Sequence, residues 1–144
     1  MAKKREQSLA EVVNHLSRLI TQSLGDAISA HGVTPGQLPV LACLWQQDGL
    51  TQRELYQQVH IEQATMSNTL ARMERDGLIR RKPDPKDRRA QRVLLTAKAR
   101  KLEAKLATAA DAVNKAALGK LKVKDKKDLL ERMGQMIDNL APPQ

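Results

Sequence analysis

The side chains best suited to specific chemistry form a short polar set between residues 63 and 68. They are Gln63, Ala64, Thr65, Ser67 and Asn68. Asn and Gln amides can form paired hydrogen bonds with adenine, and Ala and Thr methyl groups can contact the methyl group of thymine. Such a set is suited to reading base edges in the major groove of DNA. The alternative is that these are ordinary polar residues of a helical first turn, selected for capping.

Cationic side chains are concentrated soon after this set. The chain has 25 Lys and Arg against 16 Asp and Glu, and its formal net charge is +9. This balance indicates either a polyanionic partner or only a well-solvated surface. Residues 78–92 carry more than half of the excess, and the seven cations there are Arg80, Arg81, Lys82, Lys86, Arg88, Arg89 and Arg92, against Asp84 and Asp87. Contact with nucleic-acid phosphates explains this concentration better than solubility does.

The residue types used in catalysis and metal binding are scattered along the chain. His15, His31 and His60 have no metal-ligand spacing, and no nucleophile with a base and no Gly-rich phosphate loop can be recognised. We therefore expect no enzyme activity, no metal and no cofactor. Cys43 lies among aliphatic residues, which favours a small buried hydrophobic residue over a redox sensor. Its lack of a disulfide partner and the absence of a long apolar segment predict a cytoplasmic protein that does not bind membranes.

Apolar periodicity predicts a mainly helical chain with one β-hairpin. Apolar residues at steps of three and four predict a long helix from Leu9 to near Gly32. A second helix is expected to begin at Thr34 and Pro35, and a capping box of Thr51 and Glu54 predicts a third. The remaining predictions are helices over 35–47, 51–58 and 62–75, two short strands within 78–95, a helix from Thr96 to about 117, and a last helix that contains residues 129–140.

The order of these elements is typical of a winged helix-turn-helix. Two short helices are followed at once by a hairpin, an arrangement in which the second helix enters the major groove and the hairpin reaches the flanking DNA. The short polar residues 63–68 fall on that second helix, and the cations of 78–92 fall on the hairpin. The two sets of candidate residues are therefore expected to lie on adjacent parts of one surface.

Three sequence segments resemble the MarR (multiple antibiotic resistance regulator) family. They are Gly77-Leu78-Ile79-Arg80-Arg81, Asp84-Pro85-Lys86-Asp87-Arg88-Arg89-Ala90 and Val93-Leu94-Leu95-Thr96. The order of the predicted helices is similar to the family's over nearly the whole chain. The resemblance implies a single domain over residues 1–144, in which 34–96 form the winged helix-turn-helix lobe and 1–33 and 97–144 form dimerisation helices.

The resemblance also implies roles for individual residues. Asp87 and Arg89 would form the family's wing pair, and Arg89 or Arg88 at the wing tip would enter the minor groove. Arg72 would contact phosphate or brace Asp87. The full set of expected DNA-binding residues is Thr51, Gln63, Ala64, Thr65, Ser67, Asn68, Arg72, Lys86, Arg88 and Arg89.

These observations predict a homodimeric, sequence-specific transcriptional regulator that binds a near-palindromic double-stranded operator. By analogy with the MarR family that it resembles, it is expected to be a repressor that a small aromatic or phenolic ligand releases from DNA. The first alternative is an architectural protein that binds DNA by charge and deformability with little sequence preference. The second is a protein-interaction module that keeps the winged-helix scaffold without binding DNA.

Overall fold

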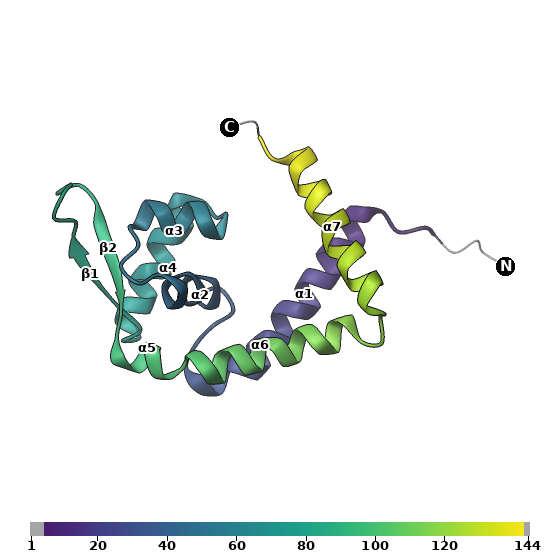
Figure 1. The fold of residues 1–144 in the computed structure, drawn as a ribbon, viewed down its shortest axis with the longest axis horizontal. Coiled ribbons are helices and arrows are strands. Elements are labelled where there is room, and N and C mark those ends of the chain that lie inside the picture. Colours follow the sequence, from purple (N-terminus) through teal and green to yellow (C-terminus); the bar gives the residue numbers. More distant parts are fainter. Residues whose placement is uncertain (1–4, 143–144) are drawn as a thin grey trace. The chain divides into compact units, whose positions relative to one another are not determined.

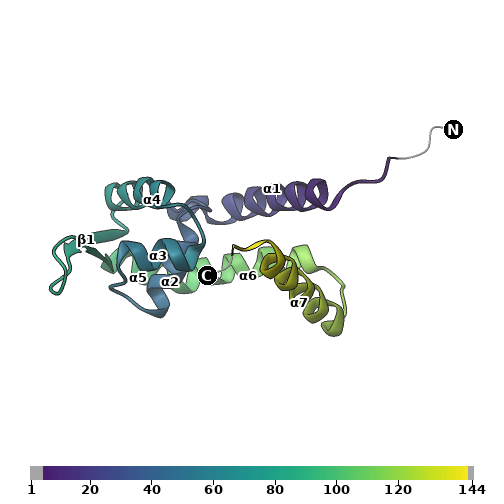
Figure 2. The same ribbon diagram turned by 90° about the horizontal axis from the view of Figure 1, so that it is seen from above.

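The computed structural model describes residues 5–142 and divides them into two compact units. The first unit ends at Val113 and the second begins at Asn114. The first four and last two residues, which belong to the predicted dimerisation segments, lie outside the described residues. In the first unit, the hairpin projects beyond the helices next to it (Figures 1 and 2).

The first unit contains five helices, one 3-10 turn, one hairpin and most of a sixth helix. The helices are α1 (Leu9–Ile28), α2 (Leu38–Gln46), α3 (Gln52–Val59), α4 (Gln63–Arg75) and α5 (Ala97–Lys101), with the 3-10 turn η1 (Ser29–His31) after α1. Strands β1 (Ile79–Pro83) and β2 (Gln91–Leu95) form the hairpin between α4 and α5. Helix α6 (Glu103–Leu118) begins in this unit and ends in the second, which also holds α7 (Val123–Leu140).

The predicted mainly helical fold with a small hairpin is confirmed. The two strands pair antiparallel, with Ile79 opposite Leu95 and Pro83 opposite Gln91. Residues 49 and 50 extend this pairing, because Gly49 donates to the carbonyl of Val93, and Val93 donates to the carbonyl of Leu50. The hairpin is thereby fixed to the turn that precedes α3.

The core of the first unit is aliphatic, as the absence of phenylalanine requires. Its buried side chains come from each of the α-helices α1 to α6 and from both strands, so that α3, α4 and the hairpin share one core. They are Ile28, Val33, Val40, Leu41, Leu44, Leu50, Leu55, Met66, Leu70, Met73, Leu78, Ile79, Val93, Leu95, Ala99 and Leu106. This common core determines where α4 and the hairpin lie relative to each other.

Two predicted helix boundaries are wrong. Helix α2 begins at Leu38 rather than Pro35, because the carbonyl of Thr34 accepts hydrogen bonds from the N–H groups of Gln37 and Leu38 in a turn. The Thr34 side chain is not the cap, and the Gln37 side chain instead accepts a hydrogen bond from the Thr34 N–H. The single helix expected from Thr96 to about 117 is broken at Leu102, so that α5 and α6 are separate.

Capping differs from expectation at one further position. At α3, Thr51 caps the Glu54 N–H at 3.1 Å, but its hydroxyl also donates to the Glu54 carboxylate, so the pair is a side-chain contact rather than the expected reciprocal box. The reciprocal box occurs at α1, between Ser8 and Glu11. The Ser-x-x-Glu spacing at residues 8–11 carries the usual signal for it.

Candidate nucleic-acid interface

Helix α4 has one buried face and one exposed polar face. Met66, Leu70 and Met73 are buried at helical spacing and hold the helix on the core. The predicted base-reading residues Ala64, Thr65 and Asn68 are all exposed, as are Gln63 and Arg72. Ala64, Asn68 and Arg72 follow one another at intervals of four residues, so they lie along one side of the helix. The exposed face can therefore contact a partner without disturbing the core.

Helix α3 is joined to α4 by a side-chain hydrogen bond. The amide of Gln52, the first residue of α3, donates to the hydroxyl of Ser67 on α4 at 2.7 Å. Both side chains are half-buried. Ser67, which the sequence placed among the base-reading candidates, is thus already engaged within the protein.

The hairpin loop, residues 84–90, is held at its base by a buried carboxylate. Asp84 is 8% exposed, and its Oδ1 accepts the Lys86 N–H at 3.0 Å. The same oxygen lies 3.4 Å from Nε of Arg92, and Arg92 also donates to the Gly49 carbonyl at 2.9 Å. The hydrogen bond from Lys86, followed by the charge of Arg92, lowers the pKa of Asp84 below its usual value. Asp84 therefore anchors the loop to the body of the lobe.

The tip of the loop is organised by Asp87. Its Oδ1 accepts the backbone N–H of Arg89 at 3.0 Å, and its carbonyl accepts the N–H of Ala90. Within residues 5–142, no ion pair joins the Asp87 and Arg89 side chains, and none joins Arg72 to Asp87. The contact between Asp87 and Arg89 runs through the backbone, which leaves the Arg89 guanidinium free to meet a partner.

The seven cations of residues 78–92 divide into two groups. Arg81 pairs with Glu74 of α4 at 3.4 Å, and Arg92 pairs with Asp84. The other five are exposed and have no carboxylate partner among the described residues; they are Arg80, Lys82, Lys86, Arg88 and Arg89. Three of these five, Lys86, Arg88 and Arg89, lie in the loop and the other two lie in β1, so most of the unpaired cations are in the loop.

A cleft of about 530 Å³ connects the hairpin to the two helices. Four of the residues predicted from the sequence lie in it together, namely Thr51, Gln63, Asp87 and Arg89. The rest of its lining is Gln52, Arg53, Tyr56, Ala90 and Gln91. The predicted proximity of the hairpin to the start of α4 is therefore present in the structure.

Sequence reasoning missed Arg53 and Tyr56 in this cleft. Arg53 is exposed in the first turn of α3, two residues after the cap Thr51, and Tyr56 is half-buried one turn later. Arg53 could have been predicted from the sequence, because a cation in the first turn of a predicted helix is a candidate for phosphate contact. Tyr56 could not, because its place in the cleft depends on the tertiary packing of α3 against the hairpin.

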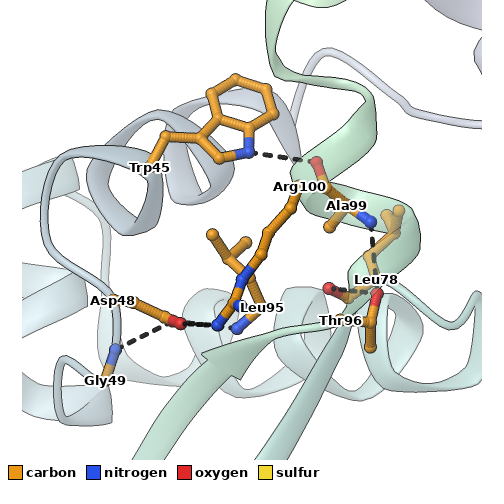
Figure 3. A network of polar contacts seen from close by, with 8 residues as sticks. All are labelled: Trp45, Asp48, Gly49, Leu78, Leu95, Thr96, Ala99 and Arg100. Atoms are coloured by element: carbon orange, nitrogen blue, oxygen red, sulfur yellow. Dashed lines mark hydrogen bonds and ion pairs between the residues drawn. The ribbon is translucent and has the colours of Figure 1, made fainter.

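A polar network joins the hairpin to α5 (Figure 3). The Asp48 carboxylate accepts the N–H groups of Gly49 and Leu95 and pairs with Arg100 at 2.8 Å. The Thr96 hydroxyl donates to the carbonyls of Gly77 and Leu78, which lie between α4 and β1, and caps the Ala99 N–H. The Trp45 indole donates to the Ala99 carbonyl. These contacts fix the strand ends of the hairpin, so that only its loop projects.

The other candidate chemistry is not assembled in the described part of the chain. Residues 5–142 contain no group of three or more His, Cys, Asp and Glu residues that could hold a metal ion. Cys43 is half-buried, and burial raises the pKa of its thiol, which disfavours the reactive thiolate. His15 is exposed on α1, in a recess lined by Arg5, Gln7, Glu11, Asn14 and Arg18. Over the same residues, no helix is both long and apolar enough to cross a membrane.

Comparison with known proteins identifies the family to which this chain belongs. A sequence model described as the MarR family matches residues 33–90, which cover α2 to the end of the hairpin loop. The transcriptional regulator HosA of Escherichia coli O111:H- is 31% identical over 106 residues, which cover 74% of this chain and 78% of HosA. The chain belongs to the MarR family. The resemblance inferred from the hairpin motifs is thereby confirmed.

Solved MarR-type structures share the fold over most of the chain. The Staphylococcus aureus MepR–DNA complex matches with a TM-score of 0.87 and 25% identity, and covers 94% of this chain and 100% of MepR. A MarR regulator from Methanosarcina mazei Go1 matches with a TM-score of 0.82 and 26% identity, over 91% of this chain and 94% of the other. The winged-helix fold and the assignment to a family of transcriptional regulators are both confirmed.

Proposed function

We propose that this MarR-family regulator binds double-stranded DNA with sequence specificity through α4 and the hairpin loop together. The observation that carries the proposal is the cleft in which Thr51, Gln63 and Arg89 lie together. Because one cleft joins both helices to the loop, a single duplex can contact all three elements. The DNA-bound structure of MepR, a similar protein, supports the same partner.

In this proposal, α4 lies in the major groove. Its exposed face offers the amides of Gln63 and Asn68 and the methyl groups of Ala64 and Thr65 to base edges. Arg72 is exposed two turns after Ala64 and is placed to contact phosphate. The short side chains allow the helix to approach the base pairs closely.

The hairpin loop is assigned to the minor groove and the neighbouring phosphates. Arg89 and Arg88 at the loop tip are exposed, and a narrow minor groove attracts arginine through its strong negative potential. Lys86 contacts phosphate beside them, and Thr51 does the same from the start of α3. Asp87 holds the tip in shape through the backbone of Arg89.

The proposal includes a homodimer. Helix α1 exposes Leu9, Val12, Val13, Leu16 and Leu19, and α7 exposes Leu129, Leu130, Met133, Met136, Ile137 and Leu140. Contiguous apolar helix faces of this kind mark protein interaction sites. We assign residues 1–33 and 97–144 to dimerisation and 34–96 to the DNA-binding lobe of one domain. Two α4 helices spaced by about one DNA turn, roughly 34 Å, would then meet a near-palindromic operator.

Repression and its release by a small ligand complete the proposal. An aromatic or phenolic acid would act by binding more tightly to a dimer whose α4 spacing no longer fits successive major grooves. Titration of a panel of such acids against the operator complex tests this step. If no acid in the panel changes the affinity for the operator, the proposed release by a ligand is wrong. The proposal that the protein recognises DNA would still stand.

Selection of bound duplexes from a random pool tests sequence-specific recognition. Purified protein is incubated with the pool at one fixed salt concentration, and retained duplexes are amplified over several rounds and sequenced. A regulator of the proposed kind enriches a near-palindromic sequence, which it then binds about 10³-fold or more tighter than a scrambled duplex. Retention without enrichment would favour the architectural alternative, and no retention in dilute salt would favour the protein-interaction alternative.

A further inference from the structure

We infer that Gln52 is a positioning residue for DNA recognition, and that Ser67 belongs to this positioning contact rather than to the base-reading surface. The inference rests on the proposed function and deepens it. Its basis is the 2.7 Å hydrogen bond from the Gln52 amide to the Ser67 hydroxyl. This bond is the one side-chain hydrogen bond between α3 and α4 among the described residues.

The polar residues of α4 separate into engaged and free groups. The Ser67 hydroxyl accepts from Gln52, and the Thr69 hydroxyl donates to the Thr65 carbonyl within the helix. Ser67 and Thr69 are both half-buried, whereas Ala64, Thr65 and Asn68 are exposed. Ser67 also lies one residue from the buried Met66, toward the flank of α4 that meets α3. The free face is therefore centred on Asn68, with Ser67 at its edge.

The first turns of α4 have few other anchors. Glu62 is the N-cap of the helix, but its side chain makes no capping hydrogen bond. Gln63, Ala64 and Thr65 are exposed, and Met66 is the first buried residue. A helix held by one apolar side chain at this end can rotate about its axis more easily than one held at two points. The bond to Gln52 supplies the second point, beside Met66.

Rotation of α4 would displace Asn68 relative to the base edges. Hydrogen bonds weaken steeply with misalignment, so a small rotation reduces specific contacts more than it reduces phosphate contacts. Loss of the bond is therefore expected to lower affinity for the operator while leaving affinity for a scrambled duplex unchanged. One partly buried hydrogen bond corresponds to about twofold to tenfold in affinity.

A double-mutant cycle tests the inference. Gln52→Ala, Ser67→Ala and the double variant are compared with wild type for binding to the selected operator and to a scrambled duplex, across a range of salt concentrations. Gln58→Ala, an exposed amide later in α3, is the matched control. We expect each single variant to lose about twofold to tenfold on the operator, the double variant to lose no more than either, and the salt dependence to stay constant.

Each of the following outcomes would overturn the inference. A change of base preference in Ser67→Ala alone would make Ser67 a base contact. A weaker salt dependence in Gln52→Ala would make Gln52 a phosphate contact. Operator affinity that is unchanged, or additive losses in the double variant, would remove the coupling. Urea unfolding of each variant measures the effect on stability. A variant with a lower free energy of unfolding but full operator affinity would show that the bond stabilises the fold and has no role in DNA recognition.

Binding by the wild-type protein distinguishes failure of the proposed function from failure of the role assigned to Gln52. If the wild-type chain selects no operator, the proposed function fails before the variants are compared. If wild type discriminates operator from scrambled DNA and the cycle shows no coupling, only the role of Gln52 is wrong.

Discussion

The carboxylate of Asp84 lies 3.4 Å from the Nε atom of Arg92, at the base of the hairpin loop. The same carboxylate accepts the N–H of Lys86, so one buried group joins the start of the loop to β2. The loop tip, by contrast, is exposed and carries Arg88 and Arg89. Anchoring at the base and exposure at the tip are the features that a DNA-contacting wing needs.

Replacement of Asp84 by Asn is expected to destabilise the protein in a pH-dependent manner. The pKa of Asp84 is lowered in the folded state, so its charged form stabilises the fold. This stabilisation is complete above the unfolded-state pKa of about 3.9 and is lost as the pH falls through the lower folded-state value. Urea midpoints should therefore differ between wild type and Asp84→Asn at pH 7 and converge in acid. The exposed Asp87→Asn is the control, and a constant difference at all pH values would contradict the account.

Removal of the Arg89 side chain is expected to weaken binding to every duplex. Arg89 has no carboxylate partner in the described chain and lies in the cleft beside Thr51. Arg89→Ala should lower the slope of log affinity against log salt by about one. Arg81→Ala is the matched control, because Arg81 pairs with Glu74. Equal effects of the two variants would show that the division of cations into paired and free groups has no functional meaning.

Truncation of Asn68 is expected to change which sequence is preferred. Asn68 is exposed at the centre of the free face of α4, and a bidentate amide contact discriminates against a wrong base by about 1–3 kcal/mol. Asn68→Ala should lose this discrimination at one position of each half-site while keeping the salt dependence. Binding to a panel of single-base operator variants measures it. Thr69→Ala, whose hydroxyl is bonded within α4, should leave the preference intact. A uniform loss across the panel would argue against base reading by Asn68.

A charge on the apolar face of α1 is expected to dissociate the dimer. Leu16 is 44% exposed in the single chain and belongs to the stripe assigned to dimerisation. Leu16→Glu would bury an unpaired carboxylate in that interface, which is costly. Sedimentation velocity should show a monomer for this variant and a dimer for wild type. Gln22→Glu, an exposed polar position of the same helix, should remain dimeric. A dimeric Leu16→Glu would place the interface elsewhere.

Local sequence signals predicted the elements that depend on short-range contacts. Apolar spacing from Leu9 identified α1, and the hairpin followed from Leu78 and Ile79, the Pro83-Asp84-Pro85 turn, and Val93 to Leu95. The motif between Gly77 and Thr96 is specific enough to indicate the MarR family from the sequence alone. Turn and helix signals of this kind act over a few residues and can therefore be read directly.

Contacts between distant residues could not be predicted in the same way. The sequence does not distinguish Asp84, which is buried at the base of the loop, from Asp87, which is exposed at its tip. The sequence around Leu102 has a continuous helical pattern, but the helix is broken there. Near this break, the indole of Trp45 in α2 donates to the Ala99 carbonyl. The contact of Gln52 with Ser67 also spans two helices. Each of these features depends on tertiary packing, which overrides local propensity.

A hydroxyl-radical footprint on the selected operator tests the central claim most directly. If α4 and the hairpin loop contact one face of the duplex in each half of a dimer, wild type protects two backbone stretches about one helical turn apart, with a flanking minor-groove region outside each. Arg89→Ala should lose the flanking protection and keep the two central stretches. Protection without a repeat, or flanking protection that is unchanged in Arg89→Ala, would contradict joint binding by the helix and the loop.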